Sequence, residues 1–153
     1  MEIKFSNKLA EFLAKPGIEG VVLKPYLDSV KVPTIGIGTT VYPNGKKVTM
    51  QDPPITLEQA YEFCLDHLNK IVLPVLKKVL TVEQTQNQID ALGSLAYNIG
   101  TGAFTSSSVL KSINTQEPIE TIKANWAKWN KAGGKVLNGL VNRRAAEIKL
   151  YTS

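Results

Sequence analysis

Residues 19–40 read E-G-V-V-L-K-P-Y-L-D-S-V-K-V-P-T-I-G-I-G-T-T, and the rest of the chain is best interpreted outward from them. Glu19 and Asp28 lie nine residues apart in this stretch, a spacing that does not stack two side chains on one face of a helix. Pro25, between them, disfavours helix at the preceding residue and lacks a backbone donor. The two carboxylates can therefore meet only across a bend of the chain.

A pair of carboxylates is what the cleavage of a glycosidic bond requires. A protonated carboxyl donates to the leaving oxygen, and an ionised carboxylate stabilises charge or activates water. Thr34, six residues after Asp28, is a candidate to position that water. Taken alone, however, the spacing of Glu19 and Asp28 favours two solvated surface charges, because acids nine residues apart are common in soluble proteins.

Several short motifs surround these residues. Glu19-Gly20 is followed by Tyr26-Leu27-Asp28 and by Thr34-Ile35-Gly36-Ile37-Gly38. Together they resemble the phage-type lysozymes, a muramidase family with E-G, Y-x-D and T-I-G-x-G in this order and spacing. The resemblance covers nearly the whole chain, because it continues through Asp90-Ala91-Leu92, Tyr97-Asn98-Ile99-Gly100, Gly102-Ala103-Phe104, Gly134-Lys135-Val136-Leu137, Gly139-Leu140-Val141, Arg143-Arg144 and Glu147.

The resemblance implies an endolysin that hydrolyses the β-1,4 bond between N-acetylmuramic acid and N-acetylglucosamine in bacterial peptidoglycan. It makes Glu19 the general acid, Asp28 the base or charge stabiliser, and Thr34 the residue that positions water with Asp28. The T-even phage lysozymes in this family are taken to invert the anomeric centre. The distance between the carboxyls separates inversion from retention, and a sequence does not contain that distance.

The resemblance also implies four substrate-binding residues: Tyr97, Asn98, Ser107 and Arg143. For Tyr97 and Asn98 the alternative is a core tyrosine and an ordinary asparagine at a helix end. Arg143 is followed by Arg144, and one of these two arginines is expected to face the cleft and pair with Glu19.

Three features of the sequence depart from the family pattern. Lys31 and Thr39 stand where many relatives have glycine and histidine, which weakens a turn and removes an imidazole that could support the site. Pro16-Gly17 precedes Glu19 where relatives run from helical residues directly into the glutamate. How the chain presents Glu19 is therefore left open by the sequence.

We expect an α+β, lysozyme-like fold in a single domain over residues 1–153. Asn44-Gly45 is a strong hairpin signal, and it predicts a small antiparallel β lobe over about residues 26–50. Capping-box patterns begin helices at Thr56 and Thr85, so residues 56–153 form a larger helical lobe together with an N-terminal helix capped by Ser6. The active-site cleft is expected between the lobes.

The helical half contains further candidates. Cys64 is interpreted as a small core residue, because no reactive partner is near it in the sequence. His67 is either a base or a partly exposed structural histidine. Pro74 predicts either a kinked helix or the start of a new one. Trp126 and Trp129 share a helical face, which favours core packing over sugar stacking.

The composition excludes several classes of site. A single cysteine excludes an intramolecular disulfide, and one cysteine with one histidine argues against a structural zinc site. Carboxylate glycosidase chemistry needs neither a metal nor a cofactor, so we expect none. The net charge of +5 favours anionic partners such as wall polymers, but no helix-turn-helix or stacking-aromatic pattern predicts nucleic-acid binding. We expect a monomer whose partner is peptidoglycan.

The N-terminus, Met1-Glu2-Ile3-Lys4-Phe5-Ser6, lacks the apolar segment of a secretory signal. No apolar run reaches the roughly 18 residues that membrane spanning needs, so we expect no stable membrane insertion. By resemblance, the protein is expected in the host cytoplasm until a separate membrane-permeabilising phage protein releases it to the wall. Two alternatives remain open: a lytic transglycosylase, which needs no second carboxylate, and a non-catalytic peptidoglycan-binding module.

Overall fold

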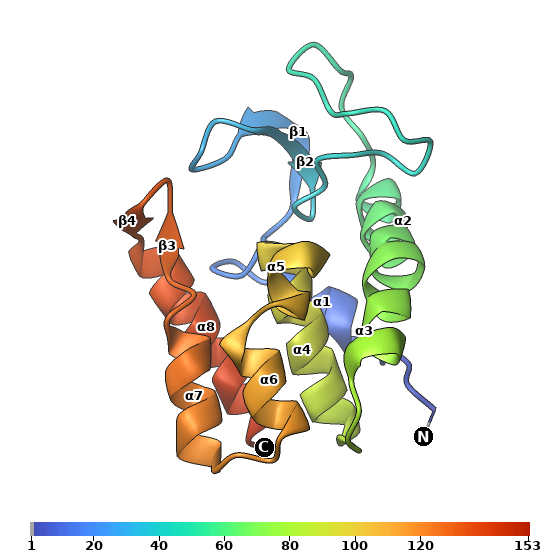
Figure 1. The fold of residues 1–153 in the computed structure, drawn as a ribbon. Helices are drawn as coiled ribbons and strands as arrows, with labels where there is room; N and C mark the ends of the chain where they lie inside the picture. Colours follow the sequence, from blue (N-terminus) through green and yellow to red (C-terminus); the bar gives the residue numbers. More distant parts are fainter. Residues whose placement is uncertain (1) are drawn as a thin grey trace.

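The computed structural model describes residues 2–153, which form a β lobe (residues 21–56) above a larger helical lobe (Figure 1). The β lobe contains β1 (Val22–Leu27) and β2 (Pro33–Gly36). The other elements are, in chain order, α1 (Lys8–Ala14), α2 (Leu57–His67), the π-helix η1 (Leu68–Val72), α3 (Leu73–Val79), α4 (Gln86–Ile99), α5 (Thr101–Thr105), α6 (Ser108–Asn114), α7 (Ile119–Ala127), β3 (Lys131–Ala132), β4 (Lys135–Val136) and α8 (Asn138–Tyr151). The expected α+β class is confirmed.

The sheet of the β lobe is shorter and earlier than expected. β1 and β2 pair antiparallel with Tyr26 opposite Thr34 and Val22 opposite Gly36. Both are edge strands, so the missing N–H of Pro25 within β1 interrupts no central ladder. Beyond Gly36, isolated bridges replace the expected longer strands. The Asn44-Gly45 turn is nevertheless confirmed, with the N–H of Tyr42 donating to Lys46 O at 2.8 Å.

The central helix of the core is α4. The expected capping box is present: Thr85 accepts from the N–H of Gln88 and the Gln88 side chain accepts from the N–H of Thr85. Every residue from Ile89 to Ala96 is buried, so the helix that the Thr85 capping box predicts is the central helix of the core. Gly93 allows the N-terminal segment and α1 to approach α4, because a Cβ at position 93 would lie 2.5 Å from the Phe5 ring and 2.9 Å from Leu9 of α1.

The N-terminal helix α1 does not begin with the expected cap. Its N-cap residue is Asn7, which makes no side-chain capping bond. The hydroxyl of Ser6 instead donates to Asp90 on α4 while it accepts from the N–H of Lys8. The Ser6 side chain, which the local sequence pattern assigned to helix capping, therefore bonds a residue that is distant in the sequence.

α2, η1 and α3 form one helical run from Leu57 to Val79. The Thr56–Gln59 capping box is confirmed. Pro74 lies in the first turn of α3. Proline has no backbone N–H to donate, and the helix is π-helical, with a wider turn, over the residues just before it. The helical spacing of apolar residues predicts one buried face made of Leu57, Tyr61, Cys64, Leu65 and Leu68. This prediction is partly wrong, because Leu57 and Leu65 are 53% and 42% exposed.

The C-terminal third returns the chain to the cleft. Ser107 caps α6, and Pro118 precedes α7. A short hairpin, β3–β4, follows α7 and reaches toward the β1–β2 turn (Figure 1). α8 then packs along α4.

The hydrophobic core lies in the helical lobe and includes Cys64 and Trp126, both fully buried. These two core assignments are confirmed, whereas Trp129 is only partly buried. Within the described residues, no helix is both long and apolar enough to cross a membrane.

Candidate active site

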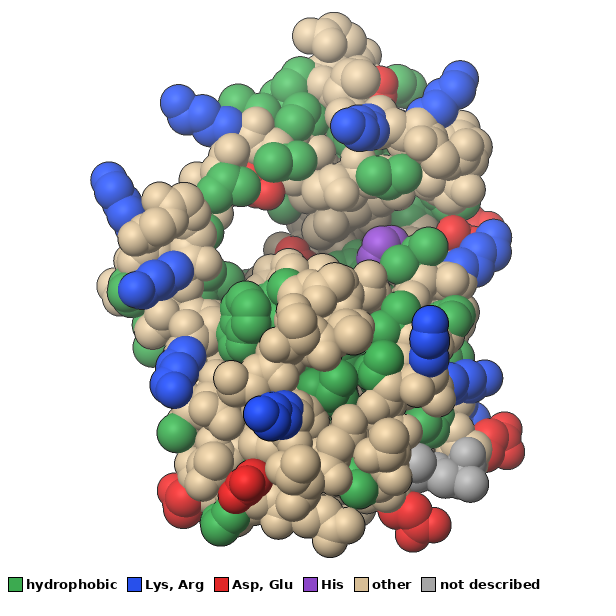
Figure 2. Space-filling view, in the orientation of Figure 1, with side chains coloured by type: hydrophobic (Ala, Val, Ile, Leu, Met, Phe, Trp, Pro, Cys, Tyr) green, Lys and Arg blue, Asp and Glu red, His purple; other side chains and the backbone are tan. Residues whose placement is uncertain are grey.

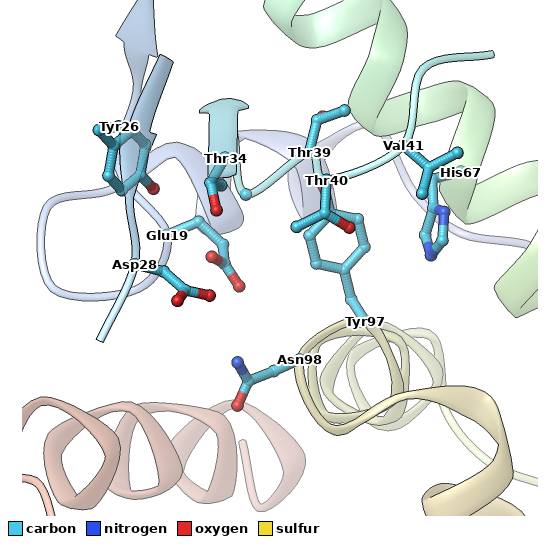
Figure 3. A pocket seen from close by; sticks show the side chains of 11 residues that line it. Glu19, Tyr26, Asp28, Thr34, Thr39, Thr40, Val41, His67, Tyr97 and Asn98 are labelled. Carbon is cyan, nitrogen blue, oxygen red and sulfur yellow. The ribbon is translucent and has the colours of Figure 1, made fainter. Parts of the chain in front are cut away.

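A cleft of about 200 Å³ separates the β lobe from the helical lobe. Figure 2 shows it as a hollow with acidic groups at its edge and the single histidine on its wall. The three expected catalytic residues all line it, and their oxygens point into the same space (Figure 3). The full lining is Glu19, Tyr26, Asp28, Thr34, Gly38, Thr39, Thr40, Val41, His67, Tyr97 and Asn98.

Glu19 is presented by a turn anchored on the end of α1. Its N–H donates to Leu13 O at 2.9 Å, so the backbone of Glu19 stays bonded to the helix that Pro16 ends. Gly17 has φ +90, a conformation that favours glycine. The Pro16-Gly17 departure thus changes the path into Glu19 while Glu19 still reaches the cleft.

The Glu19 carboxyl forms an ion pair with Arg143 of α8. The glutamate side chain is 16% exposed and that of Arg143 is 2% exposed. The guanidinium also donates to Glu147 Oε2 at 3.1 Å and to Ser94 O at 3.0 Å. The expectation that one of the two arginines pairs with Glu19 is confirmed, and the arginine is Arg143.

Asp28 ends β1 and organises the turn to β2. Its Oδ1 accepts from the N–H groups of Val30 and Val32, at 2.9 and 2.8 Å. Lys31 adopts φ +64 in this turn, so the turn forms without the family's glycine but in a conformation that costs a non-glycine residue energy. In the described chain no hydrogen bond uses Oδ2, which leaves that oxygen available to a ligand or water.

Thr34 lies opposite Tyr26 across the sheet and is buried. Its hydroxyl donates to Val32 O at 2.8 Å. Because the single hydroxyl proton is used in this bond, Thr34 can offer only an acceptor to the cleft. A water between Thr34 and Asp28 would therefore donate to both oxygens and keep a lone pair free.

The expected substrate-binding residues do not all line the cleft. Tyr97 and Asn98, at the end of α4, both line the cleft. The Tyr97 hydroxyl donates to Ile37 O at 2.5 Å, and Asn98 Oδ1 accepts from Arg144. Ser107 is not part of the cleft lining, because its hydroxyl donates to Phe104 O and accepts from Leu110 N.

Four cleft residues had no assigned role from the sequence. Burial, with the nearby charges of Glu19 and Asp28, raises the pKa of Tyr26, so its phenol stays protonated. The Y-x-D motif contains this residue and was the signal that could have found it. Thr39 has a buried hydroxyl without a partner among the described residues, while Thr40 and Val41 follow it along the wall, where no motif marks them.

His67 lines the cleft at the end of α2, where its ring packs edge-on against Tyr97 with 5.3 Å between centroids. Burial lowers its pKa, which the nearby Asp66 opposes, so the imidazole is neutral at neutral pH. Its contact is to the Tyr97 ring rather than to either carboxylate. The geometry therefore favours the structural interpretation over the base.

Comparison with known proteins agrees with this geometry. Residues 16–147 match the family described as phage lysozyme. The chain belongs to the phage lysozyme family. The match spans every cleft residue, from Glu19 to Asn98, and continues through Arg143 and Glu147 on α8.

Relatives of this phage lysozyme family member include endolysins from phages of different hosts. The endolysin of Bacillus phage PZA is 44% identical over 88% of this chain, which spans only 50% of that relative's length. The endolysin of Salmonella phage P22 is 38% identical, covering 88% of this chain and 90% of that one. A solved endolysin structure from Escherichia coli O157:H7 phage FAHEc1 superposes with a TM-score of 0.83 at 35% identity, covering 99% and 94% of the two chains.

Proposed function

We propose that this protein is an endolysin muramidase that hydrolyses the β-1,4 bond between N-acetylmuramic acid and N-acetylglucosamine in bacterial peptidoglycan. The observation that supports this most directly is the convergence of Glu19, Asp28 and Thr34 in one cleft of a phage lysozyme family member. A wall-binding module would gain nothing from holding all three groups together.

Glu19 is the general acid that protonates the leaving glycosidic oxygen. Its carboxyl is held from one side by Arg143, which leaves the cleft side for the substrate. The second carboxylate, Asp28, activates water or stabilises the positive charge that develops on the sugar. Its free Oδ2 and the acceptor-only Thr34 hydroxyl support a water positioned between them.

Substrate contacts are assigned to Tyr97, Asn98, Ser107 and Arg143. Asn98 is the best supported, because it is exposed in the cleft and its Oδ1 is fixed by Arg144, which leaves the amide N–H groups for a sugar. Ser107 and Arg143 are the least supported. The hydroxyl of Ser107 is already used within the helical lobe, and Arg143 is buried, with its guanidinium bound to Glu19, Glu147 and Ser94.

Residues 1–153 act as a single catalytic domain and a monomer, without nucleic acid as a partner. Arg143 and Arg144 are each about 1% exposed and paired with carboxylates, so the basic pair of the last helix is not available to phosphate groups. The enzyme accumulates in the host cytoplasm and reaches the wall when a separate phage protein permeabilises the membrane.

The test is a digest of purified peptidoglycan with the wild-type chain and with Glu19→Gln, analysed by mass spectrometry. Reducing N-acetylmuramic acid ends that disappear with Glu19→Gln are expected. Anhydro-muramic ends would indicate a lytic transglycosylase, especially if Asp28→Asn remained active. A folded wild-type chain that bound peptidoglycan without releasing fragments would overturn the enzymatic assignment in favour of a binding module.

A further inference from the structure

Glu147 on α8 is a fully buried carboxylate behind the cleft, with 0% of its side chain exposed. Burying an ionised carboxylate costs several kcal/mol unless hydrogen bonds and charges compensate. Here each oxygen accepts two bonds: Oε1 from Arg144 Nη1 (2.6 Å) and Trp126 Nε1 (3.1 Å), and Oε2 from Arg143 Nε (3.1 Å) and Ser94 Oγ (2.5 Å). All acceptor positions of the carboxylate are therefore filled.

The two arginines that Glu147 binds each contact a residue that lines the cleft. Arg143 uses Nε on Glu147 and Nη2 on Ser94 O, which leaves Nη1 directed at Glu19. Arg144 uses Nη1 on Glu147 and Nη2 on Asn98. A planar guanidinium held at two edges has little freedom to reorient, so Glu147 fixes the side chains that contact Glu19 and Asn98.

Glu147 also sets the charge behind Glu19. Burial disfavours the charged form of Arg143, but the carboxylates of Glu19 and Glu147 outweigh it and raise the pKa of this arginine above its usual value. Burial lowers the pKa of Arg144, and the Glu147 carboxylate opposes that change. Without Glu147, Arg143 would keep Glu19 as its carboxylate partner, whereas Arg144 would have none among the described residues.

We propose that Glu147 is a positioning residue for Glu19: it orients Arg143 and Arg144 and cancels one of their two positive charges. Glu19 thereby faces one net positive charge instead of two, and the guanidinium that binds its carboxyl is held in one orientation. This inference rests on the proposed role of Glu19 as general acid.

Other titratable groups surround Glu19 and are unchanged by the proposed test. The groups near it from the packed elements are Tyr26 and Asp28 of the β lobe, Cys64 of α2, Tyr97 of α4, and Arg143 and Arg144 of α8. Of these, the arginines are the buried cations, and Glu147 touches both. Replacing Glu147 is therefore the most direct way to change the charge behind Glu19.

The experiment uses Glu147→Gln, which removes the negative charge of this side chain and keeps its size and shape. Arg143 then loses the charged acceptor of its Nε–H, so its ¹⁵N NMR side-chain signal, identified by its absence in Arg143→Lys, should shift and exchange faster with solvent. With Arg143 misoriented behind Glu19, kcat on peptidoglycan should fall by about tenfold while KM changes less than kcat.

Two further variants separate charge from structure. Ser94→Ala removes a neutral donor to Glu147 and should lower stability while the Arg143 Nε–H signal stays protected. The charge-balanced Glu147→Gln/Arg144→Gln removes one buried cation together with the carboxylate, so it should fold and still lose the protected Arg143 signal. If Glu147→Gln fails to fold, the step from Arg144→Gln to the double variant measures the same effect.

A folded Glu147→Gln protein with the wild-type Arg143 signal and kcat would overturn the proposal, as would a double variant whose Arg143 signal matched that of Arg144→Gln. A wild-type chain that cleaves no peptidoglycan would contradict the proposed function instead. The NMR signals would still test the positioning of Arg143 in that case, because they need no turnover.

Discussion

Gly38 lies directly against the carboxyl of Glu19: a Cβ atom at position 38 would be 2.5 Å from Glu19 Oε1 and 2.7 Å from its Cδ. The glycine also has φ +71, a conformation that other residues rarely adopt. The second glycine of T-I-G-x-G is thus required by the position of the acid as well as by the turn after β2.

Gly38→Ala should therefore displace the Glu19 carboxyl and lower kcat on peptidoglycan by about 100-fold, the effect expected of a 1 Å misplacement. Gly36→Ala is the matched control, because Gly36 has φ +69 but would place its Cβ near Ile55. Both changes should lower the free energy of unfolding by about 1 to 2 kcal/mol. Equal activity in the two variants would show that the contact with Glu19 is unimportant.

The Tyr97 hydroxyl links α4 to the β lobe through Ile37 O. Tyr97→Phe should leave that carbonyl without its partner and lower the free energy of unfolding by about 1 kcal/mol in urea. Tyr61→Phe is the control, because Tyr61 is also partly buried but makes no side-chain hydrogen bond among residues 2–153. If both variants unfold at the same urea concentration, the hydroxyl does not stabilise the junction between the lobes.

The sequence correctly predicted the structural elements that depend on neighbouring residues. The capping boxes at Thr56 and Thr85 and the Asn44-Gly45 turn depend on residues within a few positions of each other, and all three are present. The lysozyme motifs likewise predicted that Glu19 and Asp28 share a cleft. In these cases the interacting groups are close in sequence or belong to a motif with fixed spacing.

Features that depend on distant partners were missed or misassigned. Ser6 was expected as a helix cap, but Asp90 lies 84 positions away and takes its hydroxyl. Leu57 and Leu65 fit the apolar stripe of α2, yet periodicity does not say which residues a neighbouring element will cover. The contact of Glu147 with Trp126 likewise exists only because α7 and α8 meet.

Lys31 is strained at φ +64 in the turn that Asp28 organises. Lys31→Gly should relieve the strain, and after the greater chain entropy of glycine is subtracted it should stabilise the fold by about 0.5 kcal/mol. This corresponds to a rise in Tm of about 1 to 2 °C. Lys31→Ala keeps the strain and removes the same charge, so an equal rise in its Tm would attribute the gain to charge rather than conformation.

His67 gives the fold a pH dependence whose direction follows from its burial, which lowers the pKa of this histidine below 6.5. The unfolded chain therefore binds a proton as the pH falls through about 6.5, while the folded chain stays neutral until a lower pH. The free energy of unfolding should fall as the pH drops from 7 to 5, and this slope should be shallower in His67→Gln. Asp66→Asn should make it steeper, because Asp66 raises the pKa of His67. Urea unfolding at pH 5, 6 and 7 measures these slopes, and an unchanged slope in His67→Gln would assign the pH dependence to other groups.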